Sequence, residues 1–265
     1  MKLPNEIYKY RTCDQRGLDV LRKQELWLAA PSTLNDPLDC RIPVRYELGT
    51  FRQIYDKTLK YLKDKHPEWN RGRVKKVARI KTQYIHHNQK NKELVQSFRE
   101  EHAKINDQRY GVCSLSSTNL SPVMWSQYAG SHKGLCIGIN SIKLEQLLQS
   151  QRRIYWLDYV KYPEELPILN PFFDEVQVHL DQIFTKSKHW AYEEEVRLIV
   201  AEKPNSRFGP ISSIISSVTV GNQISDRNLE SIVSIIKSLN TSILLYKTSF
   251  LENSFDMELE RVLYG

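Results

Sequence analysis

The chain has 265 residues and a formal net charge of +7, and its composition, 40% hydrophobic and 26% charged, is ordinary for a soluble globular protein. No apolar run approaches the roughly 18 residues of a membrane span, and the N-terminus lacks the apolar core of a secretory signal, so we expect a cytoplasmic protein with no membrane partner. Four scattered cysteines without a Cys-x-x-Cys pair predict free thiols.

The positive charge is concentrated in one segment. Between Lys57 and Arg109 there are 15 Lys or Arg against 6 Asp or Glu, a net +9, whereas the remainder has 23 against 25, a net −2. This pattern indicates a local basic surface and not a generally cationic protein. A solvated helical face and a nucleic-acid-binding surface are both open interpretations of the segment.

Apolar periodicity predicts the elements of the first half of the chain. We expect a strand at Glu6–Arg11, a short helix at Leu18–Lys23, a strand at Glu25–Ala29, a loop at Pro31–Asp39 and an edge strand at Arg41–Leu48. The segment Phe51–Ala103 is mostly helical, with breaks near His66-Pro67 and at Gly72. It is interpreted as a basic helical insertion, at about residues 51–106, between sheet elements.

The second half alternates strands and helices. Strands are expected at Arg109–Ser116, Gly134–Ile139, Ile154–Tyr162, Tyr192–Val200, Ser217–Gly221 and Ser242–Thr248, and helices at Ser121–Ala129, Lys143–Leu148, Asn170–Phe184 and Asp226–Leu239. Ser121 and Ser225 are the expected N-caps. Together the elements predict the α+β class, as one domain over residues 1–265 with a mixed, mostly antiparallel sheet.

The strand expected at 192–200 carries an unusual arrangement of charge. Tyr192 and the apolar residues after it would occupy one face, and Glu193, Glu195 and Arg197 the other. Two ionised carboxylates on one strand face, roughly 6–7 Å apart, repel each other. The charged face is therefore either solvated or directed into a site.

Two further features could share such a site. Arg11 at the end of the first strand is either a surface cation or a clamp for phosphate or carboxylate oxygens, for which a guanidinium group has the matching planar geometry. Ser114 and Ser116 end a later strand, where small hydroxyl groups are either loop chemistry or donors to a bound sugar or amide.

In this order, Arg11, Ser114-x-Ser116 and Glu193-x-Glu195 resemble the Arg–Ser–Glu signature of mono-ADP-ribosyltransferases. The resemblance implies a split sheet of that type, NAD as substrate and no metal. It also implies that Arg11 holds an NAD phosphate, that Ser114 or Ser116 braces the ribose, and that Glu195 stabilises the oxocarbenium-like transition state as nicotinamide leaves. Glu193 would position or deprotonate the acceptor, which is a macromolecule or water.

A second resemblance extends over most of the chain. A bacterial family known as domain of unknown function 2971 resembles the chain in the segments Tyr8–Arg11, Leu26–Ala29, Leu34–Asp39, Ser114–Ser116, Met124–Ile137 and Lys188–Arg197. For an ADP-ribosyltransferase-like enzyme in bacteria, a role as toxin or phage-defence effector is the expectation, although no residue specifies it. The basic segment would be the variable part of this family.

The remaining candidate NAD-binding residues follow from the same resemblances. Trp125, Tyr128 and His132 share a face if the helix continues, and they either pack in the core or form an aromatic wall beside the nicotinamide or adenine. The loop residues Asn35 and Asp36 either close a turn or reach over the pocket, and Tyr10 neighbours Arg11.

Two other functions remain open at this stage. In the first, Asp36, Glu193 and Glu195 hold Mg²⁺ in a nuclease, although Arg197 replaces the lysine of the usual Glu-x-Lys pattern. In the second, the basic helices form a non-catalytic domain that binds nucleic acid. The acceptor of ADP-ribose, the oligomeric state and the pathway are not specified by the residues.

Overall fold

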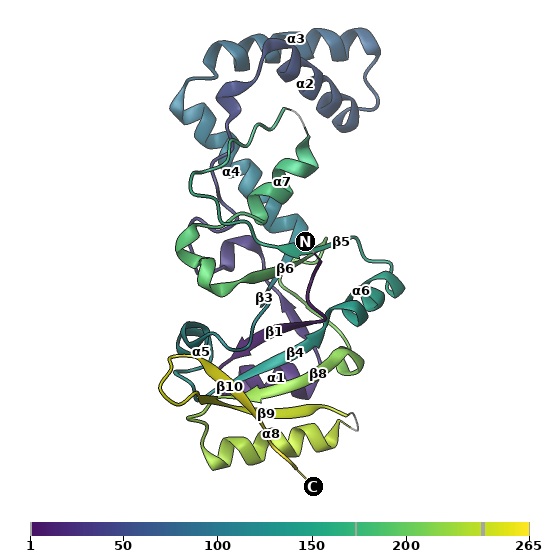
Figure 1. Ribbon diagram of the computed structural model, residues 1–265. Helices are drawn as coiled ribbons and strands as arrows, with labels where there is room; N and C mark the ends of the chain where they lie inside the picture. Colours follow the sequence, from purple (N-terminus) through teal and green to yellow (C-terminus); the bar gives the residue numbers. More distant parts are fainter. Residues whose placement is uncertain (1, 173, 240–241, 265) are drawn as a thin grey trace.

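The computed structural model describes residues 2–172, 174–239 and 242–264. The molecule is elongated, with a sheet in the lower part and the helices of residues 51–109, the segment predicted as an insertion, toward the upper end (Figure 1). Within the described residues, eight strands form one sheet in the order β10-β9-β8-β4-β1-β3-β6-β5, and β2 and β7 form a small second sheet. Only the β8–β9 pair of the large sheet is parallel, so the predicted α+β class with a mostly antiparallel sheet is confirmed.

The strands of the large sheet are β1 (Glu6–Arg11), β3 (Tyr110–Ser116), β4 (Leu135–Asn140), β5 (Tyr155–Tyr159), β6 (Glu195–Ala201), β8 (Ile215–Val220), β9 (Leu244–Phe250) and β10 (Met257–Arg261). The small sheet pairs β2 (Leu26–Leu28) with β7 (Ser206–Phe208). Sequence patterns did not predict β7 and β10. A strand of three residues such as β7 is too short for its alternation to be recognised.

The helices are α1 (Gln15–Lys23), α2 (Phe51–Lys65), α3 (Arg71–Asn88), α4 (Lys92–Arg109), α5 (Pro122–Tyr128), α6 (Ser141–Ser150), α7 (Glu175–Ile183) and α8 (Asp226–Ser238). The two expected N-caps are confirmed, because the side chain of Ser121 accepts from the amide of Met124 and that of Ser225 from the amide of Asn228. α7 begins later than predicted, and residue 173 of that prediction lies outside the described residues.

Apolar residues cover both faces of the central strands. On one face Ile137, Leu198 and Val218 belong to the largest cluster, which α1 and α8 cover. On the other face Tyr10 packs edge-to-face on Trp125 of α5, with ring centroids 5.4 Å apart. Because both faces are covered, polar side chains of the central strands are buried and need partners.

The large sheet is nearly split between β1 and β3, a junction that we call the seam. β1 pairs with β4 through six residue pairs, and β3 pairs with β6 through seven. Across the seam, in contrast, Tyr8 and Ser116 are the one pair in register. Next to that pair, a side chain makes the contact across the seam: Nζ of Lys9 donates to the backbone carbonyl of Ser114 at 2.5 Å.

Two expectations about the region before β3 are wrong. Residues 41–48 form no edge strand: Val44 makes an isolated bridge to Leu169, and Tyr46–Leu48 is a 3₁₀ helix. The insertion breaks at residues 66–70 and again at 89–91, not at Gly72, which lies in the first turn of α3, where a glycine costs little. Its last helix, α4, continues to Arg109.

The helices of the described residues include none with the length and apolar character needed to cross a membrane. All four cysteines carry free thiols, as predicted.

Candidate functional site

The strand predicted at 192–200 begins only at Glu195. Tyr192 and Glu193 end a 3₁₀ helix (Lys188–Glu193), and Glu194 adopts a left-handed conformation with φ 42° and ψ 49°. Glu193 and Glu195 are therefore not consecutive same-face positions of one strand, contrary to the prediction. The left-handed residue bends the chain, yet both flanking carboxylates still reach the same buried cluster of charges.

Arg197 is the centre of this cluster and is fully buried. Its guanidinium group binds Asp39 through two hydrogen bonds, of 2.9 and 3.0 Å, and Glu195 through two more, of 2.6 and 2.7 Å. It also donates to the carbonyl of Ile183 and to the sulfur of Cys40. This saturation of a buried guanidinium compensates the loss of its hydration.

Lys186 is the second buried cation. Its Nζ lies 2.5 Å from Oε2 of Glu193, 3.4 Å from Oε2 of Glu195 and 3.7 Å from Oδ2 of Asp39. The ammonium group also lies over the ring of Trp190, 4.7 Å from its centroid. Lys186 therefore bridges carboxylates from three separate segments of the chain.

The two glutamates have opposite electrostatic environments. Burial alone would raise the pKa of Glu195, but the charge and hydrogen bonds of Arg197, with help from Lys186, lower it to about 2. Burial dominates at Glu193 and raises its pKa above the ordinary value, although hydrogen bonds from Lys186 and Tyr128 oppose the rise. Glu195 is thus ionised at neutral pH, and Glu193 is the carboxylate closer to exchanging a proton.

A cavity of about 170 Å³, the seam cavity, opens between the ends of β1 and β3. It brings together the predicted site residues Tyr10, Arg11, Asn35, Ser114, Ser116, Tyr128, Glu193 and Glu195. Its lining also includes Tyr8, Lys9, Leu115, Met124 and Lys186, which were not predicted as site residues. Residues almost 190 positions apart in the sequence thus meet in one cavity.

Hydrogen bonds fix the orientation of Glu193 in this cavity. The hydroxyl of Tyr128 donates to Oε1 of Glu193 at 2.6 Å and accepts from the side-chain amide of Asn35 at 3.1 Å. The buried hydroxyl of Ser116 donates to the backbone carbonyl of Glu193 at 2.8 Å. Ser116 therefore braces the backbone beside the left-handed Glu194.

Three predicted residues lie elsewhere. Trp125 is fully buried against Tyr10 and does not line the seam cavity, and its indole donates to the carbonyl of Asn119 at 2.7 Å. His132 follows the end of α5 in a left-handed conformation (φ 64°) and stacks on Trp125 at 6.4 Å. Asp36 accepts from the amide of Leu38 and closes a local turn. The predicted helical face that joined Trp125 and Tyr128 to His132 is wrong, because α5 ends at Tyr128.

Sequence reasoning missed Lys9, Asp39 and Lys186. Lys9 and Arg11 alternate with Tyr8 and Tyr10 in a strand, and this pattern could have suggested two cations on one face. Asp39 lies outside any element, and Lys186 precedes a 3₁₀ helix, so periodicity carries no signal for either residue.

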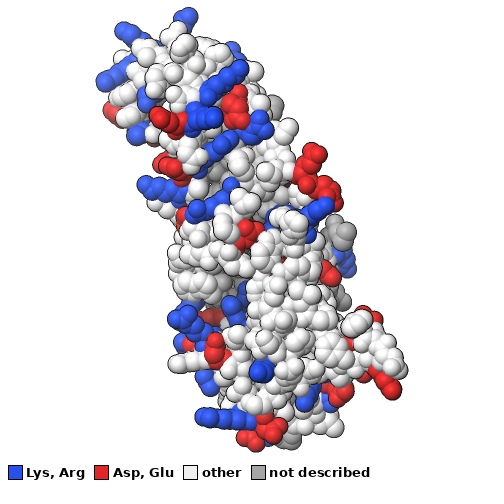
Figure 2. Space-filling model, turned by 90° about the vertical axis from the view of Figure 1, so that its left-hand side faces the viewer, with Lys and Arg blue, Asp and Glu red and all other residues white. Residues whose placement is uncertain are grey.

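The described part of the chain holds no group of three or more His, Cys, Asp or Glu side chains that could bind a metal ion. In particular, Asp36 of the proposed Mg²⁺ set does not line the cavity that Glu193 and Glu195 line. The basic segment lies apart from this site, and Figure 2 shows Lys and Arg side chains over the upper end of the molecule, where α2 and α3 lie.

Comparison with known proteins gives one finding. Searches of curated proteins and of solved structures return no match. A family model does match, over residues 124–198, which run from α5 through Glu193 and Glu195 into β6. This part of the chain is thereby similar to the family described as protein of unknown function (DUF2971).

Proposed function

We propose that the protein is an NAD-dependent, ADP-ribosyltransferase-like enzyme that cleaves the nicotinamide–ribose bond. The observation that carries the proposal is the convergence of Arg11, Ser114, Ser116, Glu193 and Glu195 on the seam cavity. These residues come from β1, β3, the 3₁₀ helix that ends at Glu193 and the start of β6, and their order along the chain is that of the Arg–Ser–Glu signature. The split of the sheet at this cavity supports the same type of fold.

The permanent charge of Glu195 favours such a reaction. Glu195 is buried and lines the seam cavity, and its pKa is lowered to about 2, so an ionised carboxylate lies at the place proposed for the ribose. Nicotinamide leaves with the bonding electrons, and positive charge develops on the ribose. A fixed negative charge beside this small cavity stabilises that transition state.

The two glutamates would have different catalytic roles. Arg197 engages both carboxylate oxygens of Glu195, so Glu195 is held rigidly as the permanent negative charge. Glu193, with its raised pKa, would take the proton of the attacking acceptor, a macromolecule or water. Carboxylates whose environments separate their pKa values are the usual sign of such a division.

A direct test is the release of nicotinamide from NAD by the full chain, in buffer with EDTA, across a range of pH. We expect release without metal, with a rate that falls at acidic pH as Glu193 is protonated. In Tyr128→Phe the hydrogen bond that stabilises ionised Glu193 is lost, so the acidic limb should move to higher pH.

Tyr192→Phe is the matched control for that variant. The hydroxyl of Tyr192 donates to Gln127 at 2.9 Å, and Tyr192 does not line the seam cavity, so its pH profile should equal that of the wild type. Absence of nicotinamide release from folded wild-type protein at every pH would overturn the proposed function.

Nucleic acid is the acceptor or partner that the basic segment favours. α3 carries six Lys or Arg and no Asp or Glu, and Lys75, Lys76 and Arg79 are exposed on it. An unbalanced cationic helix attracts a phosphate backbone and releases its counterions. We infer that α3 contributes to binding of a nucleic acid.

Reversal of charge at Lys75, Lys76 and Arg79 to Glu should weaken the affinity for a 20-nucleotide probe at least about tenfold and flatten its salt dependence. Fluorescence anisotropy at several salt concentrations measures both. The same reversal at the exposed Lys143, Arg227 and Lys237, which lie on α6 and α8, is the control. Equal effects of the two triple variants would count against α3 as the surface.

A further inference from the structure

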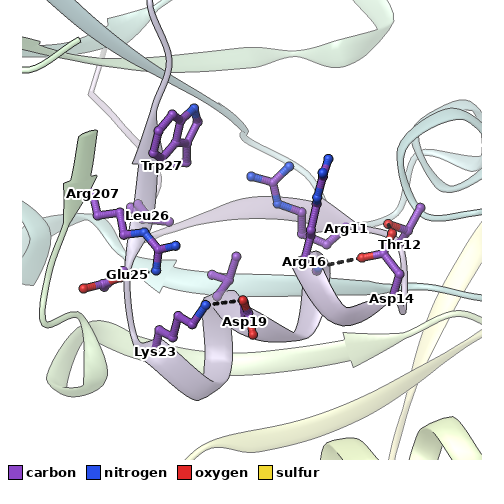
Figure 3. A pocket seen from close by; sticks show the side chains of 12 residues that line it. Arg11, Thr12, Asp14, Arg16, Asp19, Lys23, Glu25, Leu26, Trp27 and Arg207 are labelled. Carbon is purple, nitrogen blue, oxygen red and sulfur yellow. Dashed lines mark hydrogen bonds and ion pairs between the residues drawn. The ribbon is translucent and has the colours of Figure 1, made fainter. Parts of the chain in front are cut away.

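A second, larger cavity adjoins the seam cavity. This groove of about 580 Å³ lies between α1 and the small sheet of β2 and β7 (Figure 3). Arg11 lines both the groove and the seam cavity, so one side chain marks their junction. The seam cavity is too small for a dinucleotide, and the groove is the place where the remainder of a long ligand could extend.

Two cations of the groove are available to a ligand. Among the described residues no side-chain hydrogen bond or ion pair is found for Arg11 or Arg16, and Nε of Arg11 is buried without a partner. Arg16 does help to lower the pKa of exposed Asp14, after the hydrogen bonds that Asp14 accepts from Gly17 and Thr12. Figure 3 shows the Arg11 and Arg16 side chains extending toward the same side of the groove.

The acidic residues of the groove are already engaged. Asp19 pairs with Lys23, and Glu25 lies 2.9 Å from Arg207. Asp14 caps α1 by accepting from the amide of Gly17 at 2.8 Å. The carboxylates therefore leave Arg11 and Arg16 as the groups that would bind an anion, and two guanidinium groups suit the oxygens of a diphosphate.

Close packing places the two arginines together. Gly17 lies so near the end of β1 that an added Cβ would be 1.8 Å from the carbonyl oxygen of Thr12 and 3.3 Å from Cβ of Arg11. The absence of a side chain at residue 17 lets the first turn of α1 contact the strand end. Arg16 is thereby carried next to Arg11.

An exposed aromatic ring forms another part of the lining. In β2, Leu26 and Leu28 are buried and Trp27 points outward, with 44% of its surface exposed. Its partner in register is Arg207 of β7. A large exposed indole that lines the same groove as the unpaired Arg11 and Arg16 is the combination that suits an aromatic base joined to phosphate.

We propose that this groove binds a nucleoside diphosphate, with the phosphates on Arg11 and Arg16 and the base on Trp27. The inference rests on the proposed function in one respect: the nucleotide would be the ADP half of NAD, while the nicotinamide ribose occupies the seam cavity. It assigns roles to Arg16 and Trp27, which the Arg–Ser–Glu signature does not include.

Isothermal titration of the full chain with ADP and with ADP-ribose tests the groove. Arg16→Ala should weaken binding of both about tenfold, the loss of one charge-assisted contact, and Trp27→Ala at least about fivefold, the loss of one stacked base. Arg22→Ala is the control, because Arg22 is exposed on α1 but does not line the groove. Circular dichroism verifies that each variant is folded.

The outcomes separate the two proposals. Failure of ADP to bind wild-type protein at millimolar concentration, or unchanged affinity in both Arg16→Ala and Trp27→Ala, overturns the groove assignment. Binding of ADP that both variants weaken, without any nicotinamide release, supports the groove and contradicts the proposed function. Nicotinamide release with an unchanged KM for NAD in both variants supports the proposed function and contradicts the assignment of the groove as the nucleotide site.

Discussion

Replacement of Arg197 by leucine is expected to lower the free energy of unfolding by about 3–5 kcal/mol. Arg197 is fully buried and supplies four hydrogen bonds to Asp39 and Glu195. Leucine fills part of the space but leaves these buried carboxylates with Lys186 as their one close counter-charge among the described residues. Removal of one partner from a buried ionic network is far more destabilising than loss of an exposed ion pair.

Urea denaturation followed by circular dichroism measures this effect. Arg207→Leu is the matched control, because Arg207 also lies on a strand and pairs with a carboxylate, Glu25, but is half exposed. Its loss should change the free energy of unfolding by less than about 1 kcal/mol. Similar values for the two variants would show that the Arg197 cluster does not hold the fold together.

The Arg197→Leu variant should also respond differently to acid. In the wild type the pKa of Glu195 is lowered to about 2, so its stabilising contribution is complete above its ordinary pKa of 4.5 and is lost as the pH falls toward 2. Without the guanidinium group, burial raises the pKa of Glu195 instead. Mild acid should then narrow the difference in stability between the two proteins.

Glu195→Gln is expected to reduce the rate of nicotinamide release about 10²–10³-fold, the loss that follows removal of one preorganised electrostatic group. Glutamine keeps the shape of Glu195 but removes the negative charge that Arg197 holds at the seam cavity. The fall should appear in kcat more than in KM, because positive charge develops only in the transition state. Steady-state initial rates of nicotinamide release over a range of NAD concentrations give both values.

A loss of activity through misfolding needs a separate control, and Asp39→Asn provides it. Asp39 gives Arg197 the same bidentate partner as Glu195 does, but it does not line the seam cavity. Both variants should be destabilised, whereas Asp39→Asn should keep activity within about tenfold of the wild type. Equal activity of Glu195→Gln and the wild type would refute the catalytic assignment.

The order of strands and helices could be predicted from the sequence because it depends on local periodicity. The spacing of apolar residues located β1, β3 and α8, and the hydroxyl groups of Ser121 and Ser225 marked two helix starts correctly. Local patterns failed where a single backbone conformation decides the outcome. Glu194 is left-handed, and the residues before it form a 3₁₀ helix in place of the expected strand start. Glutamate rarely adopts this conformation, so the sequence gives no signal for it.

Only some of the residues of the candidate site could be predicted from the sequence, and the reason is a different one. Glu193, Glu195 and Arg11 lie in patterned segments, so their charges stood out against apolar neighbours. Asp39 and Lys186 lie 147 positions apart in irregular segments, and their pairing depends on the tertiary fold. Arg197 also pairs with Asp39, so it is the fully buried centre of a cluster larger than the pattern of residues 193–197 indicates.

The buried cluster also restricts how this sequence can vary. Its charges come from the loop before α2, from the turn after α7, from the 3₁₀ helix that ends at Glu193 and from β6, and each has a partner in another segment. A natural variant that loses Arg197 alone would leave Asp39 and Glu195 to share Lys186, whereas simultaneous neutral replacement of Asp39 and Arg197 keeps the net charge of the cluster and leaves Lys186 to pair with Glu195. Among relatives, we expect these two positions to covary as an all-or-none pair.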